Sequence, residues 1–301
     1  MDNIHNRSDL DEATGYFGPD SVTWQLYREP LALFGGVRAL LLQVAHPSVA
    51  DGVARYSSFQ ADPFGRGVRT FTAMATIYMG SKKQAEQTAQ HLWRMHEGIK
   101  GSIPDAYSAN RPDLLLWVLA TLTDTTMEVY SRMPIKGLPA NWPEQFYEES
   151  KVTARLLGIP DADYPADLQS FRVYFRQMLD GPLLGSYPVC REVAQAIVTH
   201  PRVPKQRVRL MAAGWLPPTL CAHLGIETRP DDAAVLARWL QKCHRWFLWI
   251  PRGLRYSPSY HQAKFRIARA SGKRPTGWGY FYHFLGRVVR IPLGLAAERR
   301  R

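Results

Sequence analysis

The sequence predicts an all-α protein that folds as a single globular helical domain. Apolar residues recur at helical spacing along most of the chain, whereas the alternation typical of strands is scarce. Apolar residues make up 46% of the 301 positions and charged residues only 21%, which suits a large buried core and excludes a disordered chain. No internal repeat or break in composition divides the sequence, so we expect one domain over residues 1–301.

Start and stop signals for helices recur in order along this domain. Asp20 predicts the start of a short helix, and Pro30 suits the first turn of the apolar helix that follows. Pro63 opens a later helix, and a capping box that begins at Ser81 starts the next one directly after Gly80. In full, the predicted helices cover residues 20–27, 30–46, 63–79, 81–98, 112–133, 143–157, 166–179, 190–199, 208–224, 231–249, 259–270 and 278–289.

Positive charge is concentrated in residues 251–301, a basic C-terminal extension of the domain. The net charge is +12, and this extension holds twelve basic residues against one acidic residue. Such asymmetry predicts an anionic partner, either phospholipid or nucleic acid. The aromatic residues of 278–284, followed by Arg287 and Arg290, favour an anionic membrane surface. The alternative is an ordinary docked helix with a solvated basic tail, and nucleic acid is the weaker partner because no recognition motif accompanies the charge.

Cysteine spacing and hydropathy predict the cellular location. Cys190, Cys221 and Cys243 show no paired CxxC spacing, so we expect free, buried thiols. Residues 1–16 lack the apolar core of a secretory signal, which predicts a cytoplasmic protein that is at most peripheral at the inner face of the membrane. The longest nearly uncharged stretch, residues 30–49, is interrupted by charge, glycine and proline, and we expect a buried helix there.

A histidine occupies a position where the helical pattern predicts an aliphatic residue. One inward-facing stripe, spaced by four, three, four and three residues, consists of Ala85, Ala89, Leu92, His96 and Ile99. An imidazole in this stripe is either a core histidine satisfied by a backbone carbonyl or an axial ligand of a haem iron or another metal. His91 falls about 140° away around the helix and is expected to face solvent.

The preceding helix carries two arginines and a threonine on one face. Arg66, Arg69 and Thr70 share this face, and no acidic residue lies between Asp62 and Met79. Because an unpaired buried guanidinium is costly, the arginines need a partner. That partner is either a set of carboxylates and water from elsewhere in the fold, or the carboxylate or phosphate groups of a cofactor.

Two further polar groups are candidates for the site. Gln43, His46 and Asp51 either cap the helix ends around residue 47 or belong to the site, with His46 as a cofactor contact. Asp124 lies on a stripe that either faces solvent or supplies a buried partner for one of the two arginines, and we favour the buried partner. No GxGxxG, GxxxxGK[ST], GxSxG or HExxH motif is present, so the corresponding chemistries have no support.

An ordered set of short motifs resembles the catalytic domain of a known oxygenase family. The motifs are Gln43-Val44-Ala45-His46-Pro47, Gly52-Val53, Ser58-Phe59, Asp62-Pro63, Arg66-Gly67-Val68-Arg69-Thr70, His96-Glu97-Gly98-Ile99-Lys100-Gly101 and Trp117-Val118-Leu119-Ala120. Together they are similar to the haem-dependent oxygenases that include the latex-clearing rubber oxygenases and the MpaB-type oxygenases. The resemblance is best over residues 30–133.

This resemblance implies an all-α, globin-like core around one haem b, with His96 as the proximal iron ligand. The rubber oxygenases carry an Arg-x-x-Lys-Thr motif near the haem, and here Arg69 stands in place of the lysine. A guanidinium stays protonated and ligates iron poorly, so Arg66 and Arg69 are expected at the propionates or at bound oxygen. Thr70 would line the distal pocket, and Asp51 falls near the catalytic carboxylate of the rubber enzymes.

The leading hypothesis is therefore a haem b-dependent oxygenase that uses dioxygen on a hydrophobic small molecule, such as an unsaturated or isoprenoid one. A first alternative is a non-catalytic haem protein, either a sensor or an electron-transfer module. A second is a basic helical protein that binds a membrane or nucleic acid. Oxygen consumption with substrate and reductant separates the enzyme from the sensor, because the chemistry belongs to the cofactor in both.

Overall fold

The computed structural model describes residues 2–57, 63–201 and 204–288, and it confirms the all-α class. The helices are α1 (Asp2–Thr14), α2 (Val22–Tyr27), α3 (Gly36–Ala45), α4 (Pro47–Tyr56), α5 (Pro63–Met79), α6 (Lys82–Glu97), α7 (Pro112–Arg132), α8 (Trp142–Leu156), α9 (Leu168–Asp180), α10 (Pro188–Val198), α11 (Lys205–Ala213), α12 (Pro218–His223), α13 (Asp232–Trp249), α14 (Arg252–Arg255), α15 (Pro258–Ala270) and α16 (Gly277–Val288). A 3-10 helix, η1 (Pro30–Gly35), precedes α3, and strands β1 (Lys100–Gly101) and β2 (Tyr107–Ser108) pair antiparallel.

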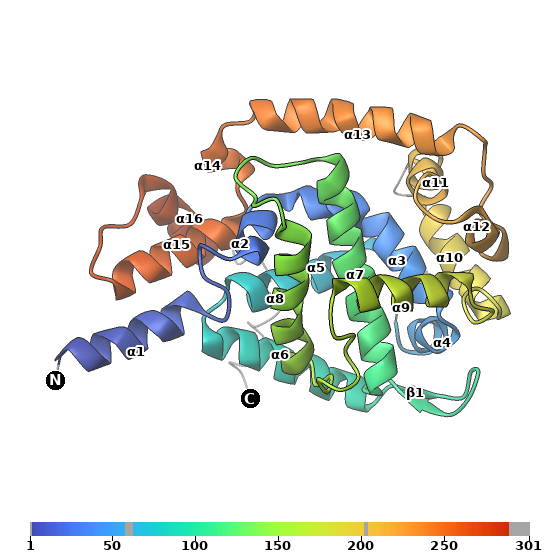
Figure 1. Ribbon diagram of the computed structural model, residues 1–301, viewed down its shortest axis with the longest axis horizontal. Helices are drawn as coiled ribbons and strands as arrows, with labels where there is room; N and C mark the ends of the chain where they lie inside the picture. Colours follow the sequence, from blue (N-terminus) through green and yellow to red (C-terminus); the bar gives the residue numbers. More distant parts are fainter. Residues whose placement is uncertain (1, 58–62, 202–203, 289–301) are drawn as a thin grey trace.

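The long helix α7 lies in the middle of the molecule, with α3, α5 and α8 around it and α13 across one side (Figure 1). Its fully buried Trp117 donates from Nε1 to the carbonyl oxygen of Leu42 on α3 at 3.0 Å. The same indole stacks on Phe175 of α9, with ring centroids 5.5 Å apart. Because the indole buries a large apolar surface while its N–H keeps a partner, this contact fixes α3 and α9 against α7.

The predicted corner between α5 and α6 forms as expected. The Ser81 side chain accepts a hydrogen bond from the Gln84 N–H, and the Gln84 side chain accepts one from the Ser81 N–H, which completes the capping box. Gly98 is the C-cap of α6. The two helices then pack against each other, so their far ends lie on the same side of the domain.

The observed helices differ from the predicted ones where proline residues or tertiary contacts determine the backbone conformation. The predicted helix 208–224 is two helices, α11 and α12, because Pro217 and Pro218 lack the N–H groups that a continuous helix needs. The first part of the predicted helix 30–46 is the 3-10 helix η1. Helices α1, α4 and α14 and the strand pair lie outside the predicted elements.

The described part of the C-terminal extension is docked on the rest of the domain. Arg255 Nη2 lies 3.0 Å from Glu29 Oε1, and both side chains are largely buried. On α15, the Arg266 guanidinium donates to the carbonyl oxygens of Ala13 and Met79 at 2.8 and 2.6 Å. Burial lowers the pKa of Arg266 to about 10. Figure 1 shows α15 and α16 side by side next to α1, in agreement with these contacts.

Helices α3 and α4 form the sharpest bend in the apolar part of the chain. Among the residues that the structure describes, no single helix is long and apolar enough to cross a membrane. The segments Pro30–Ala45 and Pro47–Tyr56 reach the required length and composition only as a pair, and they are bent by 100° at the break between them. Most of α3 is buried in the core, so the apolar run serves packing.

Candidate active site

Helix α4, the end of α6, the strand pair and the start of α7 meet at one place, which we call the hairpin corner. Asp51 of α4 is its central residue and is only 3% exposed. One carboxylate oxygen accepts a hydrogen bond from Arg55 Nε at 2.6 Å, and the other accepts one from the Tyr107 hydroxyl at 2.9 Å. The i, i+4 spacing on α4 brings the Arg55 guanidinium over the carboxylate. The corner therefore joins a helix to a strand through one carboxylate.

Gly101 on β1 is required for this close approach. A Cβ atom built on Gly101 would lie 2.2 Å from Asp51 Oδ2 and 2.6 Å from the Tyr107 hydroxyl oxygen. Any side chain here would displace the carboxylate or the phenol, because both contacts are far inside van der Waals distance. The strand pair thus holds its glycine over Asp51, with Gly101 opposite Tyr107 in the ladder.

The protonation of this cluster follows from burial and from the carboxylate. Burial, then the hydrogen bond to Asp51, raises the pKa of the Tyr107 hydroxyl well above its usual value. The hydrogen bond to Asp51 also raises the pKa of Arg55, whose side chain is half exposed. At neutral pH the Tyr107 hydroxyl is therefore protonated, and it donates a hydrogen bond to Asp51.

His46 lies between α3 and α4 and is buried beneath the same region. It was a candidate for helix capping, but its side chain makes no cap hydrogen bond at either helix. Its Nδ1 is buried and finds no hydrogen-bond partner among the described residues. Burial lowers the pKa of His46 to about 4, so the imidazole is neutral at pH 7. A neutral, buried imidazole with a free nitrogen can accept or donate one bond to a bound group.

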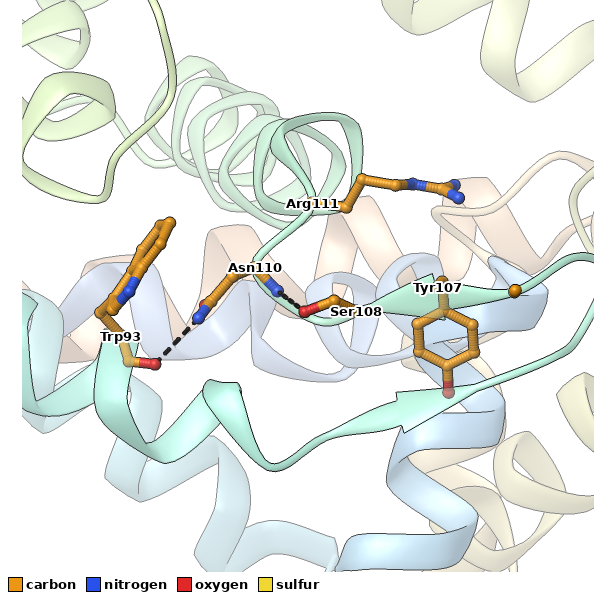
Figure 2. Close-up of a pocket in the computed structure, with 6 residues that line it drawn as sticks. Trp93, Tyr107, Ser108, Asn110 and Arg111 are labelled. Carbon is orange, nitrogen blue, oxygen red and sulfur yellow. Dashed lines mark hydrogen bonds between the residues drawn. The ribbon is translucent and has the colours of Figure 1, made fainter.

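A hollow of about 430 Å³ opens at the hairpin corner (Figure 2). Its lining residues are Trp93, Ala106, Tyr107, Ser108, Asn110 and Arg111. Asn110 Nδ2 donates to the Trp93 carbonyl oxygen at 3.0 Å, whereas Asn110 Oδ1 is buried and has no partner in the described part of the chain. Figure 2 shows the rings of Trp93 and Tyr107 on either side of Asn110. The hollow is open to solvent, and it combines two aromatic side chains with one buried polar atom that has no partner among the described residues.

His96 is half-buried in the last turn of α6, one turn beyond Trp93. The first members of its predicted stripe, Ala85 and Ala89, are buried, and its later members are half-buried. His91 is exposed, as expected. The His96 side chain interacts with neighbouring groups of the protein. Through Ile99, whose side chain faces Gly52 of α4, the end of α6 lies against the hairpin corner.

The residues predicted on α5 are placed as follows. Arg66 belongs to α5, but its side chain lies outside the described residues. Thr70 is half-buried, and Arg69 is exposed, so the expected burial of Arg69 is wrong and solvent reaches its guanidinium. The hydrogen bonds of Asp51 given by the structure run to Arg55 and Tyr107.

Arg66 and His96 nevertheless lie at the same end of the α5–α6 pair. Arg66 precedes Gly80 by 14 residues, and His96 follows Ser81 by 15 residues. Both helices rise about 1.5 Å per residue, so the two positions are at similar distances from the corner that joins the helices.

The prediction for Asp124 needs correction. Asp124 is paired with an arginine, but the partner is Arg38 of α3, and the Arg38 guanidinium also donates to Thr125 Oγ1 at 2.7 Å. Burial raises the pKa of Asp124, while Arg38 opposes that shift. Asp124 thus joins α7 to α3 through a largely buried ion pair.

Metal-ligating side chains do not cluster within the described ranges: no group of three or more His, Cys, Asp or Glu residues lies together there. The three cysteines are free, with Cys190 and Cys221 buried and Cys243 half-buried, close to the prediction. A metal centre built from side chains needs three or four such ligands, whereas a haem iron takes only one or two axial ligands from the protein.

Comparison with known proteins gives the family. Residues 24–246 match the family described as "ER-bound oxygenase mpaB/B'/Rubber oxygenase, catalytic domain". The chain belongs to this family. As a member of the MpaB/rubber oxygenase family it is an oxidoreductase of the oxygenase class. The match spans α2 to most of α13 and includes the hairpin corner.

Relatives of this MpaB/rubber oxygenase member include two mycobacterial proteins. These are the uncharacterized protein Mb2261 of Mycobacterium bovis and the uncharacterized protein Rv2237 of Mycobacterium tuberculosis. Each is 25% identical over 224 residues, which is 72% of this chain and 84% of the relative. No solved structure shows significant similarity to the chain.

The hairpin corner contains residues that the sequence analysis did not single out. The i, i+4 pair Asp51 and Arg55 was readable from the sequence as a helical ion pair. Gly101 entered only as the last residue of the motif that begins at His96, and Tyr107 and Asn110 left no signal, because strands of two residues are too short to show alternation. Their role depends on where the strand pair lies in the fold.

Proposed function

We propose that the protein is a haem b-dependent oxygenase that uses dioxygen on a hydrophobic small molecule. The observation that carries this proposal is the unpartnered, neutral imidazole of His46, buried beside the hairpin corner. A buried polar atom without a partner is costly unless a bound group completes it. Asn110 Oδ1 is a second such atom in the lining of the hollow. The two atoms fit a cofactor or substrate with polar substituents.

The side chains available fit haem better than a side-chain metal site. His96 is half-buried at the end of α6 and would supply the axial nitrogen. Arg66 and Arg69 lie on the paired helix, at the end where His96 lies, and would hold the propionates. The exposure of Arg69 suits this role, because propionates leave a haem pocket at its edge and are bound by arginine there. Thr70 would line the distal side.

Haem supplies the activation of dioxygen, and this chain supplies orientation, proton control and exclusion of water. Asp51 fixes the Tyr107 hydroxyl by accepting its proton in a hydrogen bond. Tyr107 lines the hollow, and because its single hydroxyl proton is donated to Asp51, the phenol oxygen is left to accept a hydrogen bond from a donor group of a bound molecule. The aromatic faces of Trp93 and Tyr107 favour an apolar or unsaturated substrate.

The absorption spectrum tests the cofactor. Purified protein supplied with haem should show a Soret band that shifts on reduction with dithionite. His96→Ala should lose or shift this band, whereas His91→Ala, an exposed histidine on the same helix, should leave it unchanged. Wild-type protein without any Soret band after haem is supplied would overturn the proposal. Oxygen uptake with an unsaturated hydrocarbon and a reductant then separates an oxygenase from a haem sensor.

A further inference from the structure

Large apolar side chains are exposed at the C-terminal end of α13 and on the elements that follow. Trp246 and Trp249 on α13 are 79% and 86% exposed, the highest values among the large hydrophobic residues of the described chain. The set, which we call the aromatic surface, comprises Trp246, Trp249, Ile250, Leu254, Trp278, Phe281 and Phe284. Such a concentration marks an interaction site in a folded protein.

The members of the aromatic surface adjoin one another. The α14 backbone contacts the Trp278 side chain of α16, because a Cβ atom built on Gly253 would be 2.2 Å from that ring. The ring centroids of Trp278 and Phe281 are 5.9 Å apart. Figure 1 shows α14 between the end of α13 and the α15–α16 pair. The surface therefore continues from α13 across α14 to α16.

The inner face of α16 is already packed, so its outer aromatic residues are available. Tyr282 stacks on His261 of α15 with centroids 4.8 Å apart, and Phe265 of α15 stacks on His283 at 4.2 Å. These contacts confirm a docked helix, one of the two readings of this segment. They also leave Phe281 and Phe284 at least half exposed on the other side.

The chain segment that carries the aromatic surface has charge of one sign. Residues 233–288 contain no Asp or Glu and eleven Lys or Arg residues. Two of these are used inside the protein, since Arg255 pairs with Glu29 and Arg266 binds backbone carbonyls. Among the described side chains, the exposed basic residues on these elements and their connections are Arg238, Lys242, Arg245, Arg252, Lys264, Arg269, Lys273 and Arg274. Such a surface is complementary to an anionic partner that also accepts apolar side chains.

We propose that the aromatic surface docks the protein on an anionic phospholipid bilayer. Tryptophan prefers the boundary between acyl chains and headgroups, and basic side chains bind anionic headgroups at the same depth. The aliphatic tips Ile250 and Leu254 favour lipid over nucleic acid, because aliphatic side chains cannot stack on bases. This inference does not depend on the identity of the cofactor.

Vesicle binding tests the proposal with the full chain. We expect the protein to co-sediment with vesicles of phosphatidylcholine containing about 30% phosphatidylserine, and about tenfold less with pure phosphatidylcholine. Trp246→Ser/Trp249→Ser should reduce binding to the anionic vesicles about tenfold, and a high-salt buffer should also weaken it. The control Val173→Ser/Tyr187→Ser changes exposed apolar residues of α9 and of the start of α10, and should bind as wild type does.

Three results would overturn the proposal. One is equal binding by wild type and the double tryptophan variant, which would mean that charge alone acts. Another is a wild-type dimer in sedimentation velocity that becomes a monomer on Trp246→Ser/Trp249→Ser, which would make the surface a subunit interface. The last is salt-dependent binding to DNA without any binding to vesicles. Circular dichroism of both double variants should match wild type, because all four residues are exposed.

Discussion

His46→Asn should remove a pH dependence of stability that the buried imidazole imposes on the fold. Burial lowers the pKa of His46 from 6.5 to about 4. Between these values the unfolded chain binds a proton that the folded chain does not, so protonation favours unfolding. The contribution of His46 to stability is therefore intact above about pH 6.5 and is lost progressively as the pH falls toward 4.

The size of this effect follows from the pKa. A pKa lowered from 6.5 to about 4 corresponds to about 3 kcal/mol in full, of which about 2 kcal/mol is lost by pH 5. The His46 side chain is only 4% exposed, and this burial is the cause of its lowered pKa. Asparagine retains an amide near the position of the unpartnered Nδ1 but does not titrate, so the variant keeps most of the packing and loses the proton linkage.

Urea unfolding of cofactor-free protein at about pH 7.5 and about pH 5 measures the linkage. Other groups titrate over this range in both proteins, so the informative quantity is the difference between wild type and variant. Between about pH 7.5 and about pH 5, we expect the free energy of unfolding of wild type to fall by about 2 kcal/mol more than that of His46→Asn. His91→Asn, which changes an exposed histidine, should behave as wild type. Parallel losses in wild type and His46→Asn would refute the assignment of a neutral buried imidazole.

Three further predictions concern packing and pairing. Gly101→Ala should cost about 1–3 kcal/mol in urea unfolding, because its Cβ atom would meet Asp51 Oδ2 at 2.2 Å, whereas Gly98→Ala, with open space around it, should cost less than about 1 kcal/mol. Glu29→Ala leaves the buried Arg255 unpaired and should lower the free energy of unfolding by about 3–5 kcal/mol in the same measurement. Asp161→Ala breaks an exposed pair with Arg155 and should lower it by less than about 1 kcal/mol. Equal losses in the two variants would contradict the burial argument. Tyr107→Phe keeps the aromatic wall but removes the hydroxyl and its hydrogen bond to Asp51, so oxygen uptake should fall by about tenfold or more in kcat with a smaller change in KM, and unchanged kcat would exclude a role for that hydroxyl.

Local signals predicted the helices well where the chain itself supplies the partners. The α5–α6 corner depends on Gly80 and on the reciprocal bonds of Ser81 and Gln84, all within five residues. Such contacts exist in any fold that contains the segment, so the sequence is sufficient to predict them. The break between α11 and α12 was equally readable from Pro217 and Pro218, and it was missed because the apolar pattern continues across it.

Long-range partners could not be predicted in the same way. Asp124 was expected to meet an arginine, and it does, but the choice of Arg38 over the arginines of α5 depends on which helix packs on which face of α7. The same holds at the hairpin corner, where the strand pair brings Tyr107 to Asp51 across 56 positions. The identities of the polar residues were visible in the sequence, but their pairing is a property of the fold.

The bend at Pro47 explains why the apolar run ends in a site. A straight helix over α3 and α4 would place His46 and Asp51 five residues apart on one continuous rod, with their side chains about 140° apart around its axis. Proline prevents that continuation, and the 100° bend turns α4 toward the strand pair while His46 remains beneath it in the core. Asp51 then reaches Gly101 and Tyr107, and His46 keeps a nitrogen without a partner. Replacing Pro47 would therefore disturb the carboxylate cluster and the imidazole together, although it touches neither side chain's hydrogen bonds directly.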